Sequence, residues 1–229
     1  MKKVIFGIFA HPDDEAFGPA GTLIQEVQNG SEVHLITLTA GQAGSNPDNH
    51  EDLGVIRLEE WKKSGELIGA SSMTHLGYKD SSLCNSSMID IAEKIESLVR
   101  QTIDQSHPDQ VEFVSFELGG ISGHIDHIVA ARATCLVFYR MKPHEQRLHR
   151  IRLFCLPQSW APAPNVGWVF MDVGYPEESI EKIDVSATLD TRVAVIKAHH
   201  TQRNDGSMHL ERLNDPKNLP HYDHFIVRR

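Results

Sequence analysis

The sequence predicts an α/β fold in which a mostly parallel sheet carries helices on both of its faces. Short apolar runs rich in strand-favouring side chains alternate with longer segments whose apolar residues recur at helical spacing. This alternation is typical of parallel sheets, because each helix carries the chain back to the start of the next strand. The length of 229 residues and the hydrophobic content of 40% fit one large domain with a single core. We therefore expect one domain over residues 1–229.

The expected elements follow from this alternation along the chain. The expected strands are 4–9, 32–39, 73–78, 111–116 and 151–156, with shorter candidates at 167–173, 183–186 and 225–227, the last at a sheet edge. The expected helices are 22–27, 51–68, 88–103, 128–138 and 190–202, followed by a polar tail from about residue 203. Ser87 with Asp90 resembles a capping pair at the start of the clearest amphipathic helix. Arg57 and Glu60, three residues apart, are expected to pair on a helix surface.

The first informative stretch is Ala10-His11-Pro12-Asp13-Asp14-Glu15, which directly follows the first strand. Ligands bind at the carboxyl ends of strands in open α/β sheets. Three carboxylates and an imidazole so close to a core would repel one another and lose solvation, unless a divalent cation balances them. The alternative is a solvated acidic turn, in which Asp14 or Glu15 caps the next helix.

The second informative stretch is Gly119-Gly120-Ile121-Ser122-Gly123-His124-Ile125-Asp126-His127, which follows the fourth strand and opens a helix. His124 and His127 lie three residues apart and project from one face of that helix. Asp126 is placed to orient a ligating imidazole through its second ring nitrogen. Both stretches follow strands of the same predicted sheet, so their side chains are expected to meet at one edge and form a metal site.

The two stretches together supply the parts of a metal-dependent hydrolase. His11, Asp14 and His127 would leave one coordination position for water, which is the arrangement of a catalytic zinc site. Asp13 would remain free to act as the general base, and His124 would stabilise the oxyanion or protonate the leaving amine. We expect metal-assisted hydrolysis of an amide or an ester. Zn²⁺ is the expected ion, although Fe²⁺ or another divalent metal accepts the same ligands.

Composition argues against several other classes of protein. The net charge is −9 and no Lys/Arg-rich run is present, so we expect neither nucleic acid nor an anionic membrane as a partner. The short apolar segment at the N-terminus does not resemble a signal peptide, and no run approaches membrane-spanning length. Cys84, Cys135 and Cys155 are widely spaced and odd in number, which favours free thiols and a cytoplasmic location.

The two motifs closely resemble those of the PIG-L/LmbE-like deacetylase family. Weaker similarities occur in the expected order at Gly41-Gln42-Ala43-Gly44, at Leu76-Gly77-Tyr78-Lys79-Asp80 and at His199-His200-Thr201-Gln202. The resemblance extends to about residue 202. It implies a Rossmann-like fold and zinc-dependent removal of an acetyl group from a small molecule that contains N-acetylglucosamine. The family's members are often oligomeric, so we also expect a homo-oligomer.

The resemblance also implies roles for individual residues. It supports the metal ligands, Asp13 as the base and His124 as the electrostatic or acid partner. Asp126, through its orientation of an imidazole, is expected as a third catalytic residue. It places the following residues near the substrate: Arg57, Asp80, His199 and Gln202. The chain departs from the family's pattern at Gln42, Lys79 and Ser81, which leaves the identity of the substrate open.

Two other classes of function account for part of the sequence. His124-x-Asp126 with a distant His also matches the ligands of a non-haem Fe(II) oxygenase, but those sites usually occur in all-β barrels. A non-catalytic sugar- or nucleotide-binding module would share the fold, although no G-x-G-x-x-G follows the first strand.

Overall fold

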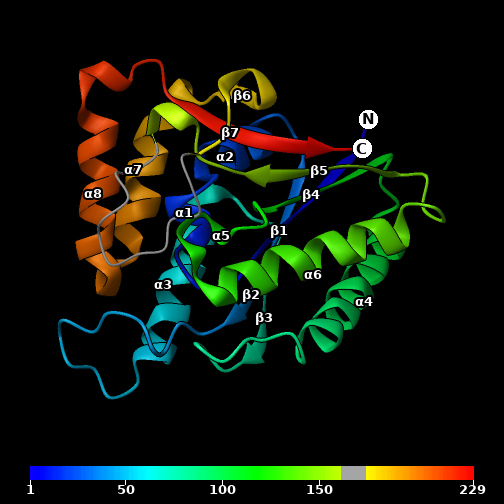
Figure 1. The fold of residues 1–229 in the computed structure, drawn as a ribbon, viewed down its shortest axis with the longest axis horizontal. Helices are drawn as coiled ribbons and strands as arrows, with labels where there is room; N and C mark the ends of the chain where they lie inside the picture. The colour runs from blue at the N-terminus through cyan, green and yellow to red at the C-terminus, as the bar shows by residue number, and fades with distance from the viewer. Residues whose placement is uncertain (161–173) are drawn as a thin grey trace.

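The computed structural model describes residues 1–160 and 174–229, in which seven strands form one sheet. Figure 1 shows the sheet surrounded by helices. The strands are β1 (Lys3–Phe9), β2 (Glu32–Thr39), β3 (Ser72–Tyr78), β4 (Gln110–Phe116), β5 (Leu148–Phe154), β6 (Glu181–Asp184) and β7 (Tyr222–Arg228). The helices are α1 (Asp14–Phe17), α2 (Ala20–Gln28), α3 (Leu53–Ile68), α4 (Met88–Ser106), α5 (Gly120–Gly123), α6 (Ile125–Met141), α7 (Leu189–Ala198) and α8 (Arg203–Asn214).

The strand order is β3-β2-β1-β4-β5-β7-β6. The first five strands are parallel to one another, whereas β7 runs antiparallel to both β5 and β6. The chain moves outward from β1 in one direction to β2 and β3, and in the other direction to β4 and β5. The boundary between β1 and β4 is therefore the topological switch point, where open α/β sheets bind their ligands. The predicted α/β, mostly parallel fold is confirmed.

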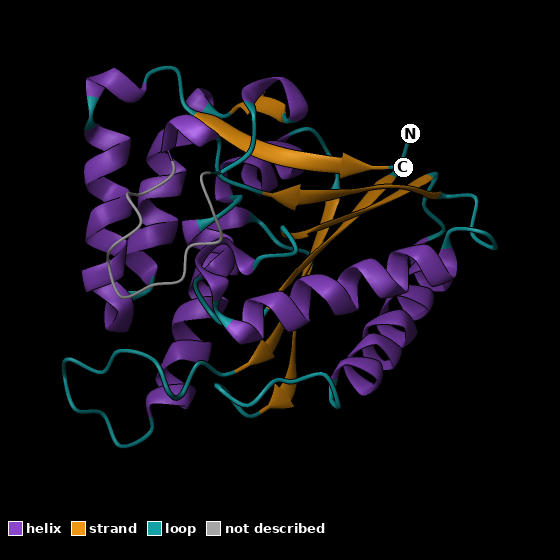
Figure 2. Cartoon of the chain, in the orientation of Figure 1, coloured by secondary structure: helices purple, strands orange, loops and turns teal. Residues whose placement is uncertain are grey.

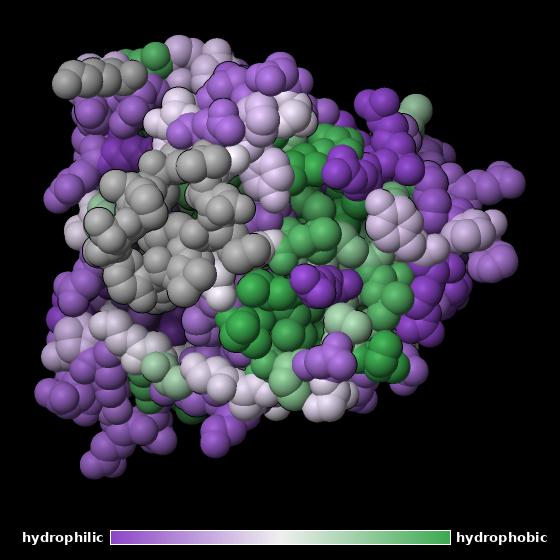
Figure 3. Space-filling model, viewed as in Figure 1, coloured by the Kyte–Doolittle hydropathy of each residue, from purple (hydrophilic) through white to green (hydrophobic). Residues whose placement is uncertain are grey.

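Two apolar clusters cover the two faces of the sheet. Alternate residues of β1 point to opposite faces, so that Phe6 packs with helices α4 and α6, while Ile5 packs with α1, α2, α3 and α7. Figure 2 shows helices on both faces of the strands. Figure 3 shows apolar residues gathered over α6 on the face in view. Ile125, the first residue of α6, is 60% exposed.

Several expectations about individual elements are wrong. β7 lies between β5 and β6 and is not an edge strand. The tail expected after residue 202 begins with helix α8, which buries only Gly206 and Leu213 and therefore gives a weak periodic signal. The strand expected at 167–173 lies outside the described residues. The hydroxyl of Ser87 bonds to Cys84, so the expected capping pair does not form.

Candidate functional site

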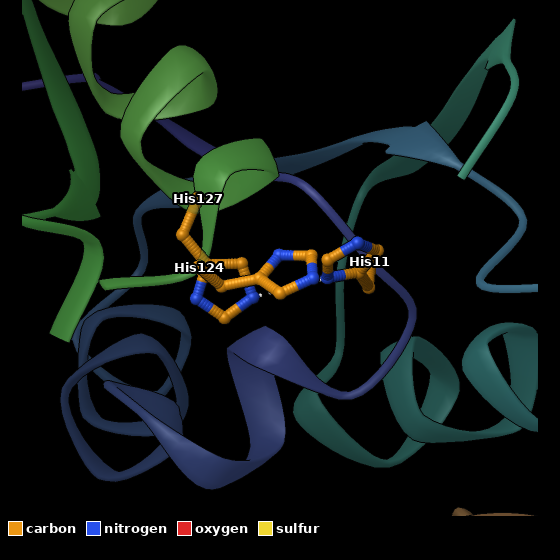
Figure 4. Close-up of side chains that lie close together, drawn as sticks. All are labelled: His11, His124 and His127. Atoms are coloured by element: carbon orange, nitrogen blue, oxygen red, sulfur yellow. Dashed lines mark hydrogen bonds between the residues drawn. The ribbon is translucent and has the colours of Figure 1, made fainter. Parts of the chain in front are cut away.

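Both sequence motifs lie at the topological switch point. The first occupies the turn from β1 into α1, and the second leads from β4 through α5 into α6. Because β1 and β4 are parallel neighbours, their carboxyl ends deliver the two motifs to the same edge of the sheet. Figure 4 shows His11, His124 and His127 facing one another from these two segments.

Three donor groups converge between the motifs. The Nδ1 atom of His11 lies 3.0 Å from His127 Nε2, and Asp14 Oδ1 lies 3.2 Å from the same His127 nitrogen. Asp14 Oδ2 lies 3.8 Å from His11 Nδ1. Burial alone would raise the pKa of Asp14, but the two neighbouring imidazoles hold it well below its usual range. The structure thus brings together the three residues that the sequence singled out as metal ligands.

The opposite side of each donor group is occupied by another hydrogen bond. His127 Nδ1 donates to the Gly120 carbonyl at 3.1 Å, which leaves the Nε2 lone pair directed at the site. Asp14 Oδ2 accepts the backbone N–H groups of Ala10 and His11 at 3.0 and 2.9 Å. Partners of this kind fix the tautomer and orientation of metal ligands in known metalloproteins.

His11 is oriented by two carboxylates at its second ring nitrogen. Its Nε2 atom lies 3.1 Å from Asp80 Oδ1 and 3.4 Å from Asp126 Oδ2. Asp126 in turn accepts the backbone N–H groups of Ser81 and Leu83. Burial opposes a charge on His11, but its bonds to Asp126 and Asp80 outweigh this effect and raise its pKa to about 10. The surroundings of His11 therefore favour positive charge.

The donor set fits a divalent metal ion. Two ligands that each lie about 2.0–2.1 Å from a tetrahedral zinc ion are about 3.3 Å apart. His127 Nε2 lies 3.0 Å from His11 Nδ1 and 3.2 Å from Asp14 Oδ1, both near that value. The 3.8 Å separation between His11 and Asp14 involves the other carboxylate oxygen, Oδ2. The ring nitrogens of His11, His124 and His127 also lie close enough together to share an ion.

His124 lies beside this cluster with one ring nitrogen unpaired. The centroid of its ring is 5.0 Å from that of His11 and 5.1 Å from that of His127. Its Nδ1 atom is buried and has no hydrogen-bond partner among the described residues. Burial, followed by the charges of the other two imidazoles, lowers the pKa of His124.

Asp13 occupies an unusual backbone conformation next to the candidate ligand Asp14. Its φ is 111°, a value that side-chain-bearing residues rarely adopt. The guanidinium of Arg57 donates from Nη2 to Asp13 Oδ2 at 2.8 Å and to the Pro12 carbonyl at 2.6 Å. Burial raises the pKa of Asp13 to about 6, although Arg57 opposes the shift. The expected surface pair between Arg57 and Glu60 does not form, because Arg57 turns into the protein.

Three of the residues predicted to bind substrate anchor the loop that follows β2. Arg57 Nη1 donates to the Gly41 carbonyl at 2.6 Å. Asp80 Oδ2 accepts the Ala43 N–H at 2.7 Å, and Gln202 Nε2 donates to the carbonyl of residue 45 at 2.8 Å. All three side chains belong to residues that are at most 5% exposed. They hold this loop in place, and their direct contact with substrate stays a prediction.

The fourth predicted substrate residue, His199, is bonded to Glu15. Its Nε2 atom donates to Glu15 Oε1 at 2.9 Å, and Ser64 Oγ donates to the same oxygen at 2.6 Å. Burial would lower the pKa of His199, but the charge of Glu15 outweighs it and raises the pKa. Sequence reasoning missed Ser64, because a serine within a helix carries no local signal of such a contact.

Glu117 is a second residue that sequence reasoning missed. It directly follows β4, and its carboxylate accepts the N–H groups of Gly119 and Ile121 at 2.6 and 2.8 Å. The hydroxyl of Tyr175 donates to it as well, at 2.9 Å. These bonds hold the loop whose Gly120 carbonyl orients His127. Glu117 could have been identified from its position directly after a strand and next to the glycine-rich motif.

Comparisons with known proteins agree on one family. The family model for PIG-L, described as GlcNAc-PI de-N-acetylase, matches residues 6–138, which include both motifs. The 1D-myo-inositol 2-acetamido-2-deoxy-alpha-D-glucopyranoside deacetylase of Mycobacteroides abscessus is 27% identical over 237 residues, covering 87% of this chain and 82% of that protein. A probable N-acetyl-alpha-D-glucosaminyl L-malate deacetylase 2 of Bacillus cereus is 30% identical over 152 residues, or 64% of this chain and 66% of that protein.

A solved structure confirms the fold over nearly the whole chain. The N,N'-diacetylchitobiose deacetylase from Pyrococcus horikoshii matches with a TM-score of 0.68 and covers 99% of this chain and 84% of its own. The two chains are 16% identical in sequence, so this likeness concerns the architecture.

Proposed function

Because the chain belongs to the PIG-L family of GlcNAc-PI de-N-acetylases, we propose that it removes the acetyl group from the amide nitrogen of a small molecule that contains N-acetylglucosamine. The observation that carries this proposal is the convergence of donor atoms from His11, Asp14 and His127 beside the buried carboxylate of Asp13. Neither an Fe(II) oxygenase nor a non-catalytic module gains support, because the matched relatives carry deacetylase names.

We assign the three converging residues as ligands of a divalent metal, with Zn²⁺ as the first candidate and Fe²⁺ as the second. When bound, the ion would make coordinated water acidic and polarise the amide carbonyl. Asp80 and Asp126 would hold His11 in the tautomer that presents Nδ1 to the ion.

Asp13 is the proposed general base. Its neighbour Asp14 is a proposed metal ligand, whereas the Asp13 carboxylate is bonded to Arg57. The Asp13 carboxylate can therefore accept the proton of the attacking water and pass it on to the leaving nitrogen. His124 is the proposed electrostatic partner. A ring with an unpaired buried Nδ1 beside the ligands is suited to bind the developing oxyanion or to donate a proton to the amine.

The relatives support a substrate in which N-acetylglucosamine carries a polar group. One relative is named for an inositol conjugate and the other for a malate conjugate. Both are small molecules, which agrees with an acidic chain that has no Lys/Arg-rich run. We propose direct substrate contacts for Arg57, Asp80 and Gln202 where loop 41–45 moves to expose them, because each is bonded to that loop. His199 is a weaker candidate near the site, because its ring is bonded to Glu15.

The compartment and the assembly of the protein are further parts of the proposal. All three cysteines are free, which supports a reducing compartment such as the cytoplasm. Among the described residues, no helix has the length and apolar character needed to span a membrane. The homo-oligomer implied by the family resemblance stays a prediction, which sedimentation analysis of the purified protein would test.

The deciding experiment measures acetate release from a panel of N-acetylglucosamine conjugates that includes inositol and malate derivatives. Wild-type protein and Asp13→Ala would be compared, each loaded with zinc or iron and each treated with a chelator. Asp104→Ala, on the exposed surface of α4, is the matched control. We expect chelator-sensitive release by the wild type and the control, and none by Asp13→Ala. Equal release by Asp13→Ala would contradict the assigned base, and no release by any metal-loaded wild-type sample would contradict the substrate class.

A further inference from the structure

The backbone of Asp13 is held in a conformation that it would not adopt freely. Its φ of 111° and ψ of −23° lie in a region that is unfavourable for residues with a Cβ. Such a conformation costs about 1–3 kcal/mol and persists only where the surrounding structure enforces it. Asp13 is also the proposed base, so whatever enforces this conformation sets the direction of its carboxylate.

Two side chains hold Asp13 from different sides, and its carbonyl accepts the N–H groups of Ala16 and Phe17 at 2.9 Å. Arg57 binds the end of its side chain and the carbonyl of the preceding residue. Glu15 binds its backbone, because the N–H of Asp13 donates to Glu15 Oε2 at 3.2 Å. The contact between Asp13 and Arg57 fixes the carboxylate, whereas the contact with Glu15 fixes the peptide that carries it.

Glu15 is itself anchored by two other helical elements. Glu15 is 0% exposed. Its Oε1 atom accepts a hydrogen bond from Ser64 Oγ of α3 at 2.6 Å and another from Nε2 of His199, which follows α7, at 2.9 Å. Ser64 is fully buried and His199 is 1% exposed. In the described part of the chain, the hydrogen bonds of this carboxylate go to Asp13, Ser64 and His199 and to none of the candidate metal ligands.

We propose that Glu15, anchored by Ser64 and His199, is a positioning residue that holds Asp13 in its catalytic conformation. This inference rests on the proposed function. The buried Glu15 carboxylate accepts hydrogen bonds from three segments of the chain. The packing of α3 against α7 therefore determines where the Asp13 carboxylate points. If the Glu15 contact is lost, Asp13 relaxes toward a favoured φ and its carboxylate moves away from the attacking water. A displacement of 1 Å at a reacting group lowers a rate by about 100-fold.

The test compares Glu15→Gln with the wild type by measuring kcat, KM and bound metal. Glutamine keeps the size of the side chain but replaces one acceptor oxygen with a donor, so it cannot accept from Asp13, Ser64 and His199 together. We expect kcat to fall about 10- to 100-fold, while KM and bound metal stay at wild-type values. Ser64→Ala removes one anchor only, and we expect a smaller fall in kcat in the same direction. Glu26→Gln is the control, because Glu26 is a buried carboxylate bonded to Lys3, Arg152 and Ser31.

A double-mutant cycle with Asp13→Asn separates positioning from general loss of structure. If Glu15 acts through Asp13, Glu15→Gln has no further effect on the residual rate of Asp13→Asn. An equal fold-loss in both backgrounds, or an unchanged kcat in the single variant, would overturn the proposal. Should Glu15→Gln fail to fold, Ser64→Ala carries the same cycle.

A structural readout keeps this inference distinct from the proposed function. The crystal structure of Glu15→Gln, or of Ser64→Ala, reports the φ of Asp13 whether or not any substrate is turned over. A shift of Asp13 out of the positive-φ region in either variant supports the positioning role, and a retained φ of about 111° in Glu15→Gln overturns it. A wild-type protein that releases no acetate would instead overturn the proposed function alone.

Discussion

Arg57 Nη2 lies 2.8 Å from Asp13 Oδ2, and both side chains are almost completely buried. The same guanidinium also binds the carbonyls of Pro12 and Gly41. It thus connects the turn after β1 with the loop after β2, at the point where the proposed base is located. A planar guanidinium can serve these acceptors at once, whereas a single ammonium group cannot do so in the same geometry.

Arg57→Lys tests this connection while keeping the positive charge. We expect kcat to fall about 10- to 100-fold, because the Asp13 carboxylate and the Gly41 loop lose their common donor. Metal content should remain at the wild-type value. Steady-state kinetics and metal analysis would check both points. Arg100→Lys, in an exposed pair with Glu96, is the control, and a wild-type kcat in Arg57→Lys would count against the role of the guanidinium.

Asp80→Asn tests the orientation of His11. The carboxylate of Asp80 faces His11 Nε2 at 3.1 Å, and loss of such a partner typically weakens metal binding about 10- to 100-fold. We expect a shift of this size in a titration against a chelator of known affinity. Asp90→Asn changes an exposed aspartate that is bonded to Tyr78 and Lys94, and it should leave metal affinity unchanged. An unaltered affinity in Asp80→Asn would show that Asp126 alone orients His11.

Gly41→Ala tests the close approach between the loop and Arg57. Gly41 has a φ of +65°, and a Cβ there would lie 2.4 Å from the Arg57 guanidinium. Gly30 has a φ of +86°, but a Cβ there would meet nothing within 4 Å. Gly30→Ala should therefore lose only about 1–2 kcal/mol of unfolding free energy, whereas Gly41→Ala should lose more and also lower kcat. Urea unfolding and kinetics would compare the pair, and equal losses with normal kcat would refute the steric argument.

His209 should make the folded protein sensitive to acid. Burial, followed by the charges of Arg192 and Arg212, lowers its pKa from 6.5 to about 4. The unfolded chain therefore binds a proton between these two values that the folded protein does not, so stability is fully present above pH 6.5 and is lost as the pH falls toward 4. His209→Gln should make the decline of Tm from about pH 7 to about pH 4.5 shallower.

The control for this pH experiment is His144→Gln, which changes an exposed histidine. Its Tm should decline with acid as steeply as that of the wild type. His209→Gln also loses the stacking of His209 on Phe17, whose ring centroids are 4.7 Å apart, so its Tm at neutral pH should be lower. The slope with pH is the decisive quantity, and an unchanged slope would show that His209 is not the group responsible.

The sequence was sufficient for the parallel core of the sheet and for the expectation that the two motifs meet at one of its edges. The five parallel strands are short runs that contain strand-favouring side chains and are separated by helical segments, so local composition and periodicity identify them. The two motifs begin at Ala10 and Gly119, just after the ends of β1 and β4. Parallel strands place such residues at one edge. His11, Asp14 and His127 could be singled out because each motif concentrates several candidate ligands within a few positions.

Only the tertiary structure decided which side chains support that site. Glu15 meets Ser64 and His199 across 49 and 184 positions of sequence, and no local pattern records a contact of that range. Arg57 looked like a surface residue of a helix, but the packing of α3 turns it toward Asp13. The place of β7 inside the sheet likewise depends on long-range pairing with β5 and β6. Periodicity reports which residues are buried, whereas the identity of a buried polar group's partner is fixed only when distant segments pack together.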